Sequence, residues 1–173
     1  DRARLEAGEP DRADRMLNER GLAYLRKNEL DPALADFESS IKLDPTQAIP
    51  RNNRAFALAR QSKLEAAIEE YSAAIRLRPS YRLAYSNRGY AYEASGQYDK
   101  AQADYKMASE GPLLRDNEEN RKIKAKAEQR LARLRTLMAE GKVTAKAMAV
   151  AERRVALVIA NGAYAHVAAL RNP

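Results

Sequence analysis

The sequence predicts an all-α protein, built from three helix-turn-helix repeats that form a right-handed superhelix, with a long capping helix and a short strand-like tail after them. Two observations carry the helical part of this prediction: a chemical pattern that recurs every 34 residues, and a helical periodicity that continues after the pattern stops. A third, an apolar β-branched run near the C-terminus, predicts the tail. Of the 173 residues, 45% are hydrophobic and 32% are charged, with only 7 Gly and 7 Pro, which is typical of a folded, helix-rich chain.

Five columns of similar residues repeat at an interval of 34. They are Gly21, Ala55 and Gly89; Tyr24, Leu58 and Tyr92; Ala33, Ala67 and Ala101; Phe37, Tyr71 and Tyr105; and Pro45 with Pro79. Small residues allow two helices to approach closely, aromatic rings fill the space between them, and proline ends the second helix of a unit. A fixed interval of this length indicates stacked helix-turn-helix units.

The first 115 residues therefore divide into three repeats. The units are 14–47, 48–81 and 82–115, and residues 1–13 are interpreted as the end of a preceding repeat. Within the units, the pattern predicts helices over 11–27, 31–43, 47–61, 64–77, 81–95 and 98–110.

A capping helix is predicted over residues 116–141. One side of it is apolar, with Ile123, Ala127, Leu131, Leu134 and Met138 at steps of four, four, three and four. The other side is basic, and Gly141 ends the helix. A solenoid needs such an end, with one apolar and one polar face. Residues 142–152 are interpreted as a linker or a short helix.

The tail over residues 153–173 has a different character. Residues 155–160 are continuously apolar and are followed by the turn signal Asn161-Gly162, which is typical of a buried strand. Nothing else in the chain supplies a sheet for it. The exposed edge of such a strand is a template for another chain, so the sequence predicts either disorder here, a homodimer through residues 154–160, or packing of the tail on the capping helix.

The 34-residue columns resemble the tetratricopeptide repeat, and the resemblance covers approximately residues 1–115. It implies a superhelix in which the first helix of each unit lines a concave groove that holds an extended peptide. The resemblance therefore implies a non-enzymatic scaffold for protein–protein interaction.

Residues 152–173 resemble the first strand and following loop of bacterial caspase-like domains, the clan that includes metacaspases. This resemblance implies an alternative function, in which the repeats are the regulatory or substrate-recruiting arm of a caspase-like cysteine peptidase. The catalytic Cys and His of that family lie on later strands. No catalytic residue is assigned in this chain, which has no Cys and a single His, His166.

The candidate binding residues all lie on the expected first helices. They are Asn18, Leu22, Arg26, Asn52, Asn53, Phe56, Arg60, Asn87 and Tyr90. Amide side chains can bond a peptide backbone, and arginine can bind a carboxylate. Two alternatives remain open: Asn53 and Asn87 could instead join adjacent helices, and Leu22, Phe56 and Tyr90 could be packing between repeats.

One specific ligand is disfavoured. Chaperone-binding members of the family hold a C-terminal carboxylate with five Lys, Asn and Arg positions on the first helices. The corresponding residues here are Asn18, Leu22, Asn53, Leu83 and Asn87. Only Asn53 matches, so a binder of chaperone tails is not expected.

The net charge of +7 is concentrated near the C-terminus. Residues 1–114 contain 18 basic and 18 acidic residues, whereas residues 115–154 contain 12 and 6. A second alternative function is therefore a basic capping helix that binds nucleic acid or an acidic surface, and the lack of interleaved aromatics makes nucleic acid the less expected of the two.

The composition also excludes several classes of function. Without Cys and with one His, disulfides, thiolate sites and multi-histidine metal sites are excluded, and no metal, cofactor or catalytic residue is predicted. The longest apolar run of six residues is too short to cross a bilayer. The compartment, cytoplasmic or periplasmic, is left open.

Overall fold

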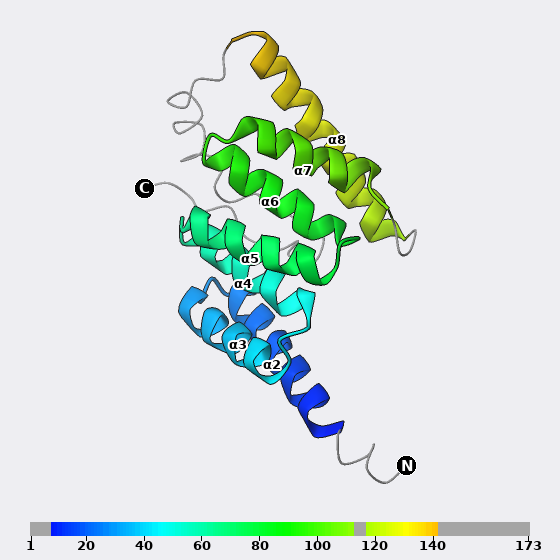
Figure 1. Ribbon diagram of the computed structural model, residues 1–173. Helices are drawn as coiled ribbons and strands as arrows, with labels where there is room; N and C mark the ends of the chain where they lie inside the picture. The colour runs from blue at the N-terminus through cyan, green and yellow to red at the C-terminus, as the bar shows by residue number, and fades with distance from the viewer. Residues whose placement is uncertain (1–7, 113–116, 142–173) are drawn as a thin grey trace. The chain divides into compact units, whose positions relative to one another are not determined.

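The structure is a computed structural model that describes residues 8–112 and 117–141 (Figure 1). These ranges contain seven α-helices and no strand, which confirms the predicted all-α class. The helices are α2 (Gly8–Arg26), α3 (Leu30–Leu43), α4 (Ala48–Arg60), α5 (Leu64–Leu77), α6 (Arg82–Ala94), α7 (Tyr98–Glu110) and α8 (Glu118–Ala139). The chain divides into two compact units, residues 1–77 and 78–173, and each is described by itself.

The first unit consists of two helical hairpins. Helix α2 packs on α3, α4 packs on α5, and α3 joins the hairpins by packing on α4. The predicted small-to-aromatic contact forms the centre of the first hairpin: a Cβ placed on Gly21 would lie 2.6 Å from Cε1 of Phe37. Phe37, Ala33 and Ala67 are fully buried. Glycine at position 21 therefore allows α2 to lie directly on the ring of Phe37.

The second unit is one hairpin followed by the predicted capping helix. Helix α6 packs on α7, and α8 packs on α7 and α6. Gly89 repeats the close approach seen at Gly21, because a Cβ there would lie 2.9 Å from the ring of Tyr105. The core includes Ala101, Tyr105, Leu131 and Leu134.

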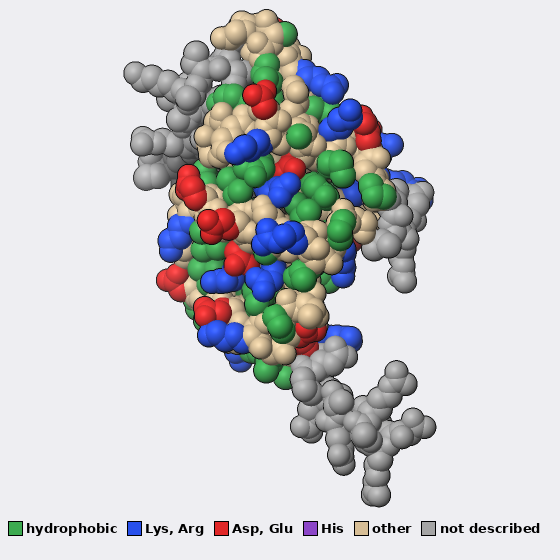
Figure 2. Space-filling view, viewed as in Figure 1, with side chains coloured by type: hydrophobic (Ala, Val, Ile, Leu, Met, Phe, Trp, Pro, Cys, Tyr) green, Lys and Arg blue, Asp and Glu red, His purple; other side chains and the backbone are tan. Residues whose placement is uncertain are grey.

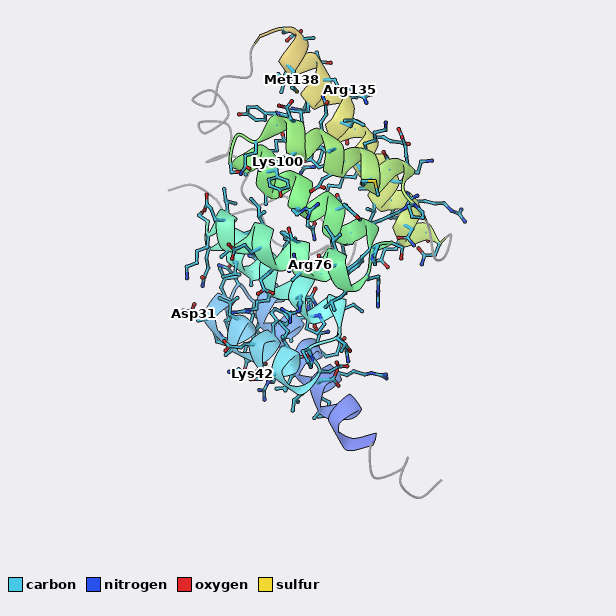
Figure 3. All side chains as sticks on the ribbon, viewed as in Figure 1. Asp31, Lys42, Arg76, Lys100, Arg135 and Met138 are labelled. Atoms are coloured by element: carbon cyan, nitrogen blue, oxygen red, sulfur yellow. The ribbon has the colours of Figure 1, made fainter. Side chains whose placement is uncertain are left out.

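Helix α8 buries the stripe that the periodicity predicts. Ile123, Ala127, Leu131 and Leu134 are buried and Met138 packs beside them. The Asn117 side chain caps the start of the helix by accepting a hydrogen bond from the backbone N–H of Asn120. Figure 3 labels Met138 and Arg135 on its C-terminal half. The helix ends two residues before Gly141, whose φ of 62° lies in the left-handed region that favours glycine.

The turn inside each hairpin has the same backbone geometry. Asn28, Ser62 and Gly96, spaced by 34, all have positive φ angles, of 65°, 61° and 76°. Each lies two residues after the end of the first helix of its hairpin. This column sets the direction of the second helix of each hairpin.

Predicted and observed helices agree closely, and the largest difference is at the N-terminus. Helix α2 begins at Gly8 rather than 11, with Pro10 in its first turn, where a proline removes no helical hydrogen bond. The linker 142–152, the strand-like tail 153–173, its dimer through 154–160 and His166 lie outside the described residues.

The surface of the repeats carries mixed charge. Basic and acidic side chains intermingle over α3 and α5 (Figure 2), in line with the balanced composition of this part of the chain. Among the described helices, none is both long and apolar enough to cross a membrane.

Candidate functional site

The candidate asparagines of the first unit lie between α2 and α4. Asn53 donates a hydrogen bond from Nδ2 to Oδ1 of Asn18 at 2.8 Å, and Asn52 donates to Oδ1 of Asn53 at 3.3 Å. All three are buried. The contact between Asn53 and Asn18 favours the interpretation that these amides join adjacent first helices.

The four remaining candidates of this unit differ in accessibility. Phe56 is only 2% exposed, so its ring is part of the packing between helices. Arg60 reaches back to the end of α2, donating to the carbonyl oxygen of Leu25 at 2.9 Å and to Oδ1 of Asn28 at 2.6 Å. Leu22 is half-buried and Arg26, one turn further along α2, is exposed. Leu22 and Arg26 are therefore the candidates of this unit that are most accessible to a ligand.

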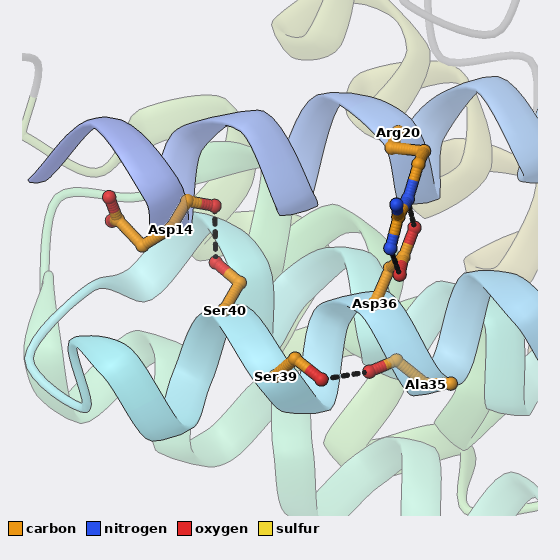
Figure 4. A network of polar contacts seen from close by, with 6 residues as sticks. All are labelled: Asp14, Arg20, Ala35, Asp36, Ser39 and Ser40. Atoms are coloured by element: carbon orange, nitrogen blue, oxygen red, sulfur yellow. Dashed lines mark hydrogen bonds and ion pairs between the residues drawn. The ribbon is translucent and has the colours of Figure 1, made fainter. Parts of the chain in front are cut away.

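An ion pair joins the two helices of each hairpin. Arg20 on α2 donates two hydrogen bonds to Asp36 on α3, at 2.7 and 2.6 Å (Figure 4). In the second hairpin Arg54 donates to Glu70 at 3.0 Å, and in the third Arg88 pairs with Asp104. Figure 4 also shows the hydroxyl of Ser40 donating to the backbone oxygen of Asp14.

Sequence reasoning missed these pairs although the signal was present. Arg20, Arg54 and Arg88 are spaced by 34, as are Asp36, Glu70 and Asp104. A charged side chain is more often solvated than paired, so a periodic charge does not by itself predict an ion pair. Their role is to align the helices that carry the candidate site.

The candidate residues of the second unit lie on α6. Asn87 is buried and Tyr90 is half-buried. The guanidinium of Arg130, on α8, lies 4.7 Å from the centre of the Tyr90 ring, a cation–π geometry. Arg130 also lies 3.6 Å from Oε2 of Glu93, which accepts a hydrogen bond of 2.6 Å from the hydroxyl of Tyr105.

The electrostatics of this cluster follow from burial. Burial raises the pKa of the Tyr105 hydroxyl well above its usual value, so the hydroxyl remains a donor to Glu93. Burial, and then the charge of Arg130, lowers the pKa of Lys126 one turn earlier on α8. Lys126 and Arg130 thus lie one turn apart on a helix outside the repeats, and Arg130 lies over the ring of Tyr90.

Family models match most of the repeat region. A tetratricopeptide repeat model matches residues 14–47 and 83–110, and a second model described as a TPR repeat matches residues 58–96. A comparison with curated protein sequences found no match.

Many solved structures have a similar fold. The first TPR of Spaghetti (RPAP3), bound to the HSP90 peptide SRMEEVD, is 30% identical with a TM-score of 0.58, and the alignment covers 70% of this chain and 94% of that one. The Arabidopsis OM64 TPR domain is 26% identical with a TM-score of 0.62, covering 72% and 98%. The TPR2B domain of yeast Sti1, in a complex with pHsp70, is 25% identical with a TM-score of 0.59, covering 68% and 98%.

Together, the hairpins and these likenesses define a helical module built from tetratricopeptide-like hairpins. The chain belongs to the tetratricopeptide-repeat family. The likenesses support the repeats and add no support for the caspase-like resemblance of residues 152–173, which lie outside the described part of the chain.

Proposed function

We propose that the protein is an interaction scaffold in which first-helix faces bind an extended peptide or a partner protein. The observation that carries this proposal is the accessibility of Leu22 and Arg26 on α2 and of Tyr90 on α6. A ligand can contact Leu22 and Arg26 without displacing a packed side chain, and it can contact the half-buried ring of Tyr90 beside Arg130. Structural relatives that bind peptides, such as the RPAP3 domain with its HSP90 peptide, add support.

The remaining candidates shape these faces. The bond between Asn53 and Asn18 fixes α4 against α2, and Arg60 fixes the end of α2. Asn52 and Phe56 are buried beside them, and Asn87 is buried on α6. In this proposal they orient Leu22 and Arg26 in the first unit and Tyr90 in the second, and a segment bound to either unit touches the accessible residues of that unit.

The ligand differs from the chaperone tails bound by some relatives. A carboxylate at a chain end needs cations on the first helices, and here Asn18, Leu83 and Asn87 occupy the positions where cations are expected. The proposed role as the recruiting arm of a caspase-like peptidase depends on residues 152–173, outside the described ranges.

A selection from a random twelve-residue peptide library displayed on phage tests the proposal. We expect binding peptides whose affinity, measured by fluorescence anisotropy, falls by about fivefold or more on Leu22→Ala or on Tyr90→Ala, which corresponds to about 1 kcal/mol. Met107→Ala, an exposed apolar residue on α7, is the matched control and should leave affinity unchanged.

Asn53→Ala tests whether Asn53 stabilises the packing of the helices or contacts the ligand. It deprives the buried oxygen of Asn18 of this donor, so the melting temperature should fall, with a loss of about 1 kcal/mol in the free energy of unfolding. If no peptide is selected, or if all selected peptides bind the Leu22 and Tyr90 variants as tightly as the wild type, the first-helix faces are not the binding site.

A further inference from the structure

One side of α8 carries a row of cations. Lys122, Lys126, Arg130 and Arg133 follow one another at spacings of four, four and three residues, which places them along one side of a helix. Helix α8 contains seven basic and three acidic residues, whereas the repeats are balanced in charge. Basic side chains gather over α8 in Figure 2.

This row adjoins the candidate site on α6. Arg130 lies over the ring of Tyr90, and α8 packs against α6. The acidic groups near the row among the described residues are Glu118, which pairs with Lys122 at 2.7 Å, Glu119 in the same first turn of α8, and Glu93, which lies 3.6 Å from Arg130. Glu93 already accepts a hydrogen bond from the hydroxyl of Tyr105. Burial, and after it the charge of Arg130, lowers the pKa of Lys126.

We propose that this side of α8, together with Tyr90, binds an acidic polypeptide segment in extended conformation, with its carboxylates on Lys126 and Arg130. This inference rests on the proposed function, because it names the ligand class for the α6 face. Each carboxylate would make a charge-assisted hydrogen bond, stronger than a neutral one.

The spacing of the cations favours an extended segment with acidic residues at alternating positions. Successive cations four residues apart on a helix are separated by about 6 Å along its axis. Side chains on one face of an extended chain are separated by about 6.6 Å. These two spacings are similar enough for consecutive carboxylates to meet consecutive cations.

A polypeptide fits this surface better than a nucleic acid does. Binding of single-stranded nucleic acid depends on aromatic rings that stack with the bases, and the ring of Tyr90 next to the row already has Arg130 over it. Helix α8 itself contains no aromatic residue.

Fluorescence anisotropy with a labelled, C-terminally amidated peptide of five Glu-Val repeats tests the proposal on the whole 173-residue chain. We expect it to bind, and the corresponding Gln-Val peptide to bind at least tenfold more weakly. Amidation removes the terminal carboxylate, so recognition of a chain end does not contribute.

Lys126→Met and Lys124→Met form a matched pair of variants. Both remove one lysine charge from α8, but Lys124 lies on another side of the helix, 3.8 Å from Glu128. We expect Lys126→Met to weaken binding about fivefold or more and Lys124→Met less than twofold. If Lys126→Met lowers the melting temperature, Arg133→Gln, exposed on the same row, should show the weakening instead.

Three results would overturn the inference. These are equal affinity for the Glu-Val and Gln-Val peptides, equal weakening by the two lysine variants, and tighter binding of a ten-nucleotide oligothymidylate than of the Glu-Val peptide. If phage-selected peptides still depend on Leu22 or Tyr90 in that case, the proposed function stands and only the acidic ligand class is wrong.

Discussion

The side chain of Arg88 on α6 donates two hydrogen bonds of 2.8 Å to the two carboxylate oxygens of Asp104 on α7. Burial raises the pKa of the Asp104 carboxyl, and the hydrogen bonds and charge of Arg88 oppose that rise. The side chains are 18% and 6% exposed, so little water can replace either partner. The pair therefore fixes the register of the two helices that carry and support Tyr90.

Removal of one partner should be costly. Asp104→Ala leaves the half-buried guanidinium of Arg88 without its carboxylate, and we expect the free energy of unfolding, measured with urea, to fall by about 2–3 kcal/mol. Arg88→Met combined with Asp104→Leu should recover most of this loss. Lys106→Ala on the same helix, whose pair with Glu110 is exposed and 4.0 Å long, is the control, with an effect below about 0.5 kcal/mol. Equal losses in the single and double variants would show that the helices do not depend on the pair.

The close approach at Gly21 makes a second prediction. In Gly21→Ala the new Cβ would meet the ring of Phe37 at 2.6 Å, so the ring or the helix must shift, and we expect a loss of about 1–3 kcal/mol in urea unfolding. Measured in a Phe37→Leu background, the same substitution should cost less, because leucine leaves room for the methyl group. A cost that is unchanged in that background would locate the effect elsewhere.

The turn after α3 gives a pH prediction. Hydrogen bonds from the side chain of Thr46, the side chain of Gln47 and the backbone of Thr46 lower the pKa of Asp44. A carboxyl with a lowered pKa stabilises the fold above its ordinary value, and that contribution is lost as the pH falls through the lowered value.

We therefore expect Asp44→Asn to melt at a lower temperature than the wild type at pH 7, and the difference to shrink as the pH falls through the lowered pKa of Asp44. Glu69→Gln, at an exposed position within α5, controls for the loss of one negative charge. A difference that persists at low pH would mean that Asp44 acts through its shape and not through its charge.

The sequence predicted the hairpins well because their causes are local and periodic. Gly21, Phe37 and Ala33 belong to columns that recur at 34 residues, and each column has one physical reason. The apolar stripe of α8 was equally visible as a helical period. The charged columns that contain Arg20 and Asp36 have the same 34-residue period. Their period alone does not distinguish a buried ion pair from a solvated surface charge.

The candidate site was less predictable, for a geometric reason. Asn53 and Asn18 are 35 residues apart rather than 34, so no column pairs them, and their bond depends on how neighbouring first helices lie. The contact between Arg130 and Tyr90 joins a helix outside the repeats to one within them, and no sequence period connects those two positions.

The ion pairs within the hairpins also bear on how such a chain can change over evolutionary time. Each pair joins the two helices of one hairpin and involves no residue of the next hairpin. A duplicated hairpin therefore carries its own stabilising ion pair. Copies can then diverge at other first-helix positions while each retains the alignment of its helices. The difference between Leu22 and Tyr90, alongside constant arginine and acidic columns, is the pattern that such a separation of roles produces.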